Sequence, residues 1–226
     1  MALAKQPERL DAALAELKRH GSKTGLAGMA RYAIPSGHAF GVPMRQIQAL
    51  AKQLGCDHDL AQALWSSGWY EARTLAAYVD DPAQVTATQM DRWCRDFDNW
   101  AICDTVCFAL FDRTPHAWTK VARWASSRDE YVKRAAFALL WGLTVHDKTS
   151  DDAPFRRGLV LIERAAADDR VYVKKAVDMA LRAIGKRNRA LRTAAMNTAT
   201  VLSTSSDKTA QWIGRHALRE LVNRRT

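Results

Sequence analysis

A repeated ten-residue segment constrains the fold of this 226-residue chain more than any other feature. YVKRAAFALL begins at Tyr131 and YVKKAVDMAL begins at Tyr172, so the two copies lie 41 residues apart. This spacing is in the range of HEAT-type repeats, in which each unit is a pair of helices. One such pair cannot bury its apolar face alone, and the repeat therefore predicts a stack of helical pairs.

Helical periodicity continues through the rest of the chain. Nearly every segment between turn residues has apolar residues at i, i+3, i+4 and i+7, and sustained alternation is almost absent. We expect an all-α fold, an α-solenoid of HEAT-like repeats with a concave basic cleft, formed as a single domain over residues 1–226. An irregular helical bundle is the alternative. The predicted helices cover residues 8–20, 43–55, 58–67, 69–80, 87–97, 99–112, 116–126, 128–143, 153–167, 170–186, 188–203 and 207–224.

Several residues suit the ends of these helices. Thr86 with Gln89, and Ser127 with Glu130, have the spacing of a capping box at a helix start. Three glycines suit the C-terminal ends: Gly21, Gly55 and Gly185.

The charge balance indicates a polyanionic partner. The net charge is +10 and the isoelectric point is near 9.7, and basic proteins of this size commonly bind polyanions. Residues 1–128 carry 15 Lys and Arg against 13 Asp and Glu, whereas residues 129–226 carry 19 against 11. We therefore expect the basic surface in the C-terminal half.

Other function classes are not indicated. No apolar run approaches the roughly 18 residues of a membrane span, and the start MALAKQPERL lacks the apolar segment of a signal peptide, so we expect a cytoplasmic protein. The four cysteines form no CxxC pair, which argues against zinc and against a disulfide framework. We expect no cofactor and no metal, with Cys103 and Cys107 in the core.

The segment 170–192 holds eight basic residues and one acid. On a helical projection, Lys175, Met179, Arg182 and Lys186 lie together, opposite the face expected to be core. A row of cations at this spacing matches phosphate contacts along a nucleic-acid backbone, and a solvated helix surface is the alternative. The core face consists of Val173, Ala176, Val177, Ala180, Leu181 and Ile184.

Asp104 is the one carboxylate in the apolar stretch NWAICDTVCFALF, residues 99–111. No basic residue lies three or four positions away, so its own helix cannot neutralise it. Asp104 either pairs with a cation on another helix, such as Arg134, or points into a cleft beside Trp100. Two unit charges about 4 Å apart interact by roughly 4 kcal/mol at an effective dielectric of about 20. If realised only in a transition state, that attraction is worth about a thousandfold in rate.

Six segments together resemble the bacterial DNA alkylation-repair glycosylases built of HEAT-like repeats, the AlkD-like family. They run in order over most of the chain: MARY (29–32), FGVPMRQIQALAK (40–52), LWSSGWYEARTLA (64–76), NWAICDTV (99–106), VKRAAFALL (132–140) and VKKAVDMALRAIGKRN (173–188).

The resemblance implies a DNA glycosylase that excises cationic N3- or N7-alkylated purines from double-stranded DNA, without a metal or a deep base pocket. Trp100 and Asp104 match the catalytic pair of the family, with Asp104 stabilising the oxocarbenium-like transition state. Arg134 matches a phosphate-contacting arginine and Tyr32 a cleft tyrosine. We expect a monomer that contacts DNA containing alkylated bases through Tyr32, Lys133, Arg134, Lys174, Lys175, Met179, Arg182, Lys186 and Arg187.

The chain departs from the family at Met179, where the family usually has a second cleft tryptophan. A methionine keeps an apolar, polarisable contact but lacks the planar indole. The neighbouring Asp178 adds a negative charge, which either opposes phosphate binding or favours a cationic substrate. The alternatives to a glycosylase are a non-catalytic DNA-binding HEAT protein and a scaffold for an acidic protein partner. The other tryptophans are predicted to be packing residues: Trp65, Trp69, Trp93, Trp118, Trp124, Trp141 and Trp212.

Overall fold

The structure, a computed structural model, describes residues 6–223. Within that range it has thirteen α-helices, one short 3-10 helix (Phe111–Arg113) and no strand, which confirms the all-α prediction. The α-helices are α1 (Gln6–Arg19), α2 (Lys23–Arg31), α3 (Met44–Leu54), α4 (His58–Ser66), α5 (Tyr70–Val79), α6 (Ala87–Arg95), α7 (Trp100–Ala109), α8 (Ala117–Trp124), α9 (Glu130–His146), α10 (Ala153–Ala165), α11 (Val171–Gly185), α12 (Arg189–Ser203) and α13 (Lys208–Asn223).

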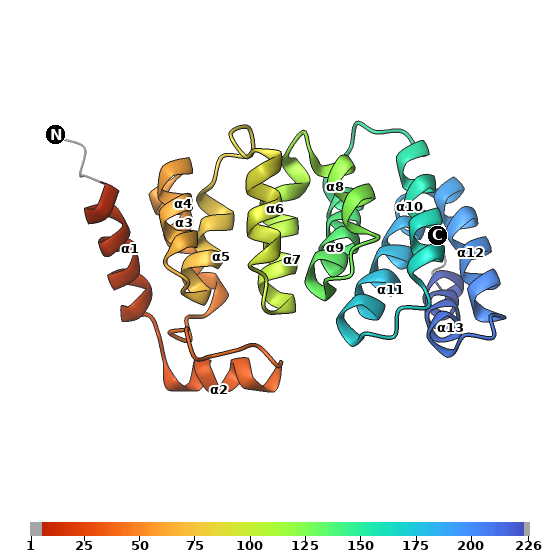
Figure 1. Ribbon diagram of the computed structural model, residues 1–226, viewed down its shortest axis with the longest axis horizontal. Coiled ribbons are helices and arrows are strands. Elements are labelled where there is room, and N and C mark those ends of the chain that lie inside the picture. The colour runs from red at the N-terminus through yellow and green to blue at the C-terminus, as the bar shows by residue number, and fades with distance from the viewer. Residues whose placement is uncertain (1–5, 224–226) are drawn as a thin grey trace.

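The helices form two layers that follow the order of the chain (Figure 1). In one layer, here called the continuous layer, α3, α5, α7, α9, α11 and α13 each pack against the next. The second layer covers it, with α4 on α5, α8 on α9, α10 on α11 and α12 on α13. Helix α2 lies at the lower edge of Figure 1 and runs across the direction of the others.

The core lies between the two layers and agrees with the projected faces. The six residues assigned to the core face of 170–192 are all buried, as are Cys103 and Cys107. No helix within residues 6–223 is long and apolar enough to cross a membrane. The same residues contain no cluster of metal-ligating side chains. The single domain, the monomeric state and the cytoplasmic location stay predictions.

Helix α2 was missed from the sequence. Two glycines interrupt its apolar pattern, and none of its residues is buried. What starts the helix is a local hydrogen bond, because the side chain of Ser22 accepts the N–H of Gly25 at 3.0 Å.

The predicted helix ends are partly confirmed. Thr86 caps α6 and accepts the N–H of Gln89, and Gly55 ends α3 with a φ of 73°. The capping box at Ser127 is wrong, since Asp129 is the N-cap of α9. The N–H of Gly21 donates to the carbonyl oxygen of Lys18, just after the end of α1. Residue 224, the predicted end of the last helix, lies outside the described range.

Gly185 is not the C-cap that the sequence suggested. It is the last residue of α11, and a Cβ there would lie 2.7 Å from Cδ2 of Leu221. The glycine therefore allows α13 to pack closely on α11.

Gly214 on α13 tests how closely the last two helices pack. A Cβ at this position would lie 2.5 Å from the carbonyl oxygen of Ala199, which is α12 backbone and cannot move aside as a side chain can. We expect Gly214→Ala to lower the free energy of unfolding by about 1–3 kcal/mol, measured by denaturant unfolding. Gly28→Ala is the matched control, because nothing lies within 4 Å of its Cβ position, and we expect it to be neutral or stabilising. Equal losses in the two variants would contradict the close approach.

Candidate nucleic-acid site

The central feature of the candidate site is an ion pair between α7 and α9. Nε of Arg134 donates to Oδ1 of Asp104 at 2.9 Å, and Nη2 donates to Oδ2 at 2.6 Å. Nη1 of Arg134 donates to the carbonyl oxygen of Tyr172 on α11 at 2.8 Å. Arg134 is only 3% exposed, so one buried guanidinium joins three successive helices of the continuous layer. Of the two interpretations of Asp104, the ion pair is the one the structure shows.

Local sequence places Asp104 at this point. The side chain of Asn99 accepts the N–H groups of Ala101 and Ile102, both at 3.0 Å, and so starts α7 at Trp100. Asp104 follows Trp100 by one helical turn, and both side chains therefore lie on the same side of α7.

Aromatic side chains surround the ion pair. The indole N–H of Trp100 donates to the carbonyl oxygen of Tyr32 at 2.8 Å, which connects α7 to the end of α2. The guanidinium carbon of Arg134 lies 6.0 Å from the ring centres of both Trp100 and Tyr172. Tyr32 is 67% exposed, so Tyr32, Trp100, Asp104, Arg134 and Tyr172 form a partly open cluster, here called the Asp104 site.

Burial and the ion pair act in opposite directions on the charges. Burial raises the pKa of Asp104 above its ordinary value, and the charge and hydrogen bonds of Arg134 oppose that rise. Burial favours a lower pKa for Arg134, but the charge and hydrogen bonds of Asp104 raise it. The bidentate geometry is that of a carboxylate with a guanidinium, and a guanidinium keeps its proton. Arg134 therefore favours the ionised form of Asp104, against the effect of burial.

Most of the cations predicted to contact DNA already have partners within the protein. Lys133 pairs with Asp168 at 2.9 Å, and Arg187 donates to two backbone carbonyl groups. Nζ of Lys174 lies 4.9 Å from the centre of the Trp212 ring. Lys175 is exposed and has no ion pair or hydrogen bond among residues 6–223. The DNA-binding roles of these residues stay predictions.

The C-terminal end of the predicted basic row is neutralised by α13. Glu220 forms ion pairs with both Arg182 and Lys186. Hydrogen bonds from Lys186 and Arg182 lower the pKa of Glu220 to about 2. Phosphate contacts to these two cations therefore require the displacement of a carboxylate. The predicted concave basic cleft stays a prediction as well.

Asp178 does not present its charge to a surface. It is 2% exposed, and its Oδ2 accepts from Nε of Arg182 at 3.0 Å. Its Oδ1 lies 2.9 Å from Nδ1 of His216 on α13. Because Asp178 is buried and paired, it presents a charge neither to a phosphate nor to a cationic substrate.

Met179 lies among cations, as the helical projection predicts. It is half-buried and lines a hollow of about 400 Å³ between α9 and α11, together with Trp141, Arg182 and Lys186. A flexible thioether in an open hollow leaves space that a larger, rigid side chain would fill.

Sequence reasoning missed the contribution of α13. Lys174, Asp178 and Arg182 on α11 contact Trp212, His216 and Glu220 on α13, at four-residue steps on both helices. Trp212, predicted to be a packing residue, is 39% exposed, and its ring lies against Lys174 of α11 and stacks on His216. The sequence does contain both sets of residues at i, i+4 and i+8, one on each helix. Their pairing can be inferred only once α11 and α13 are known to run parallel.

The stacked helical pairs place the chain in the class of HEAT-like repeat solenoids. A solved structure described as a new family of proteins related to the HEAT-like repeat DNA glycosylases, with affinity for branched DNA structures, matches with a TM-score of 0.77 and 18% identity over 93% of this chain and 94% of that chain. This match confirms the predicted HEAT-like repeat fold. An engineered protein (TM-score 0.43, 17% identity, 98% of this chain and 93% of that chain) and a designed armadillo repeat protein (TM-score 0.40, 13%, 97% and 96%) are more remote.

The chain belongs to the DNA alkylation repair enzyme family, whose sequence pattern matches residues 13–221. None of the curated proteins matches it. The resemblance inferred from the six sequence segments is thereby confirmed at the level of the family.

Removing Arg134 tests the energetic importance of the ion pair. Arg134→Met leaves a largely buried carboxylate without its counter-charge, and we expect the free energy of unfolding to fall by about 3–5 kcal/mol at neutral pH. The deficit is expected to shrink as the pH is lowered, because protonated Asp104 needs no counter-charge. Denaturant unfolding of Arg134→Met, Asp104→Asn and the double variant measures the coupling. Lys133→Met is the control: the Lys133 side chain is more exposed than that of Arg134, and Asp168 keeps its ion pair with Arg170. The expected loss is about 1 kcal/mol or less. A similar loss in both single Met variants would contradict the central place of Arg134.

Proposed function

We propose that the Asp104 site is the catalytic site of a DNA glycosylase that excises cationic N3- or N7-alkylated purines from duplex DNA. The observation that supports it is the state of Asp104. Its carboxylate lies one turn from Trp100, is held by a bidentate arginine that favours its ionised form, and remains 16% exposed. An ordinary structural ion pair has no need of a partly exposed tryptophan beside it.

The reaction fits what one carboxylate provides. The bond between C1′ of the deoxyribose and the base nitrogen breaks, and both electrons leave with the alkylated base, which becomes neutral. Positive charge develops on the sugar, where Asp104 stabilises it. Water then adds to C1′ and loses a proton, which completes the hydrolysis. Because the base is cationic before it leaves, no acid is needed to protonate it.

The remaining lone pairs of Asp104 have the capacity for this role. Each carboxylate oxygen accepts one hydrogen bond from Arg134, and a carboxylate oxygen can accept two. The unused lone pairs are available to the sugar cation or to the attacking water. Arg134 weakens the field of Asp104 but fixes its orientation, and an oriented charge needs no reorganisation during the reaction.

The neighbouring residues divide the remaining tasks. Trp100 and Tyr32 supply aromatic faces, which attract a cationic base. The three guanidinium nitrogens of Arg134 all donate within the protein, so we assign it as a positioning residue for Asp104 in place of the phosphate contact that the resemblance implied. Lys175 is the exposed cation of α11 best placed for a phosphate.

DNA binding without base excision is the second candidate. The relative with the TM-score of 0.77 is described by its affinity for branched DNA structures. Met179 also stands where the resemblance implies a second cleft tryptophan. A binder of this kind would leave Asp104 with a structural role only.

Base release separates the two candidates. We expect the protein to release 7-methylguanine or 3-methyladenine from N-methylated duplex DNA, detected chromatographically as the free base. Asp104→Asn should lower the single-turnover rate by about a hundredfold to a thousandfold, while DNA binding stays nearly unchanged. Asp59→Asn, at an exposed position on α4, is the matched control and should keep full activity. If neither the protein nor Met179→Trp releases base, the glycosylase proposal is wrong; tighter binding to four-way junctions than to duplex would then favour the second candidate.

The pH profile tests the pairing of Asp104 with Arg134. Because the reaction needs the ionised carboxylate, the rate should rise with pH and reach a plateau once Asp104 is deprotonated. Arg134 opposes the rise in the pKa of Asp104, so Arg134→Gln should move the acid limb of the profile to higher pH. Arg92→Gln, an exposed α6 residue bonded to Gln62, should leave the limb in place. The rate of spontaneous base loss at each pH is subtracted, and an unshifted limb in Arg134→Gln would refute the positioning role.

A further inference from the structure

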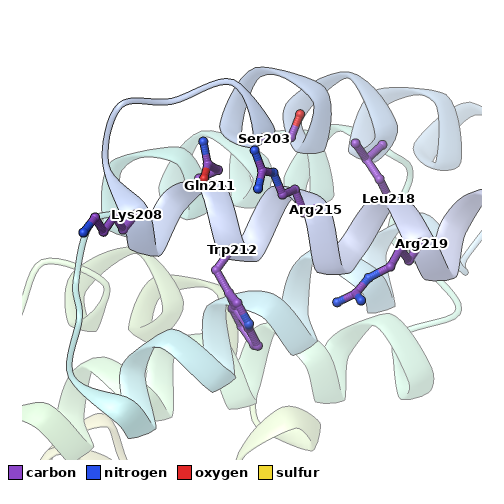
Figure 2. Close-up of a pocket in the computed structure, with 7 residues that line it drawn as sticks. All are labelled: Ser203, Lys208, Gln211, Trp212, Arg215, Leu218 and Arg219. Atoms are coloured by element: carbon purple, nitrogen blue, oxygen red, sulfur yellow. The ribbon is translucent and has the colours of Figure 1, made fainter.

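Helix α13 carries a second basic surface, outside the Asp104 site. A hollow of about 740 Å³ lies against this helix, lined by Lys208, Gln211, Trp212, Arg215, Leu218 and Arg219 (Figure 2). The sequence drew attention to the basic row of α11, and this helix was not among the predicted DNA contacts.

The cations of this hollow have no partner among the described residues, unlike Arg182 and Lys186 at the end of α11. Lys208, Arg215 and Arg219 are exposed, and none of them has an ion pair or a hydrogen bond within the described part of the chain. On α11, by contrast, Glu220 and Asp178 neutralise Arg182 and Lys186. Together with Lys175 on α11, the three cations of the hollow therefore supply uncompensated charge at this end of the continuous layer.

The spacing of the cations selects an extended anion. Positions 208, 215 and 219 fall on one face of a helix, and at about 1.5 Å per residue they span roughly 16 Å. One small anion cannot contact all three side chains at that separation. A chain of phosphates can, since it presents charges at regular intervals along its length.

Trp212 adds an aromatic group to this surface. At 39% exposure it is the most exposed of the eight tryptophans. Its ring stacks on His216 with centroids 5.0 Å apart and planes 5° apart, and His216 is in turn bonded to Asp178. The indole is thus held in position without being buried, so little conformational entropy is lost when a ligand packs on it.

We propose that the α13 hollow binds single-stranded nucleic acid, with phosphates on Lys208, Arg215 and Arg219 and a base against Trp212. Proteins that bind single strands combine a positive groove with exposed aromatic rings, because every unpaired base has a face to stack. A duplex buries its base faces and an acidic peptide has none, so neither uses Trp212 in this way. The hollow lies three helices along the layer from α7, roughly 24–30 Å from the Asp104 site at about 8–10 Å per helix.

Binding of unmodified DNA to the 226-residue chain tests this proposal independently of base release. Fluorescence anisotropy compares an oligo-dT strand of about twelve nucleotides, within the usual range of site sizes, with a duplex of equal length. We expect Trp212→Ala to weaken single-strand binding about tenfold and duplex binding less than about twofold, while Trp212→Phe keeps most of the affinity. Thermal unfolding of each variant checks that the fold is intact, and the Phe variant keeps the test decisive if the Ala variant fails to fold.

Charge variants provide the second measurement. The triple variant K208Q/R215Q/R219Q should reduce the slope of log affinity against log salt by about two for single strands. The control triple R156Q/R157Q/R164Q removes the same charge from exposed arginines on α10, in the second layer, and should change the slope by less than about one. Equal effects of the two triples would overturn the proposal, as would a loss of duplex binding equal to the loss of single-strand binding in Trp212→Ala. The proposal would also be overturned if polyglutamate bound as tightly as oligo-dT and if Trp212→Ala and Trp212→Phe lost that binding equally.

Discussion

A charge placed inside a stack of helices must have a partner on a neighbouring helix, and this requirement organises the centre of the protein. The guanidinium of Arg134 is the partner of Asp104 on α7, and it also donates a hydrogen bond to the Tyr172 carbonyl on α11. The repeat fold supplies such neighbours because the continuous layer sets successive helices side by side. The geometry of Asp104 therefore depends on the stacking of α7, α9 and α11 and on no single loop.

Much of the fold was predictable because it depends on local patterns. The apolar periodicity identifies helices that bury one face, and it is set by residues a few positions apart. The 41-residue repeat then indicates that pairs of these helices stack. Helix α2 shows where the rules fail: it buries nothing and depends on a serine cap, so no apolar pattern marks it. Gly185 shows a related limit, since its role comes from Leu221 on another helix.

The candidate site was only partly predictable, for the same reason. The isolation of Asp104 on its own helix indicated a partner elsewhere, and Arg134 was the cation named. The partners of Arg182, Lys186 and Lys174 were not foreseeable, because they lie on α13 and depend on the register between two parallel helices. A helical projection shows which face a side chain occupies but not what the neighbouring helix places opposite it.

The position of Glu220 bears on how contacts with DNA at this end of the protein translate into affinity. Its carboxylate already occupies Arg182 and Lys186, so a phosphate arriving there exchanges one anion for another. Arg182 and Lys186 are already neutralised by Glu220, and the displaced carboxylate stays attached to the same chain. More arginine and lysine side chains would then touch the DNA backbone than the number of ionic interactions gained. The number of charges inferred from the salt dependence of binding would be smaller than the number of contacts seen in a structure, because Glu220 on α13 already pairs with two of the cations.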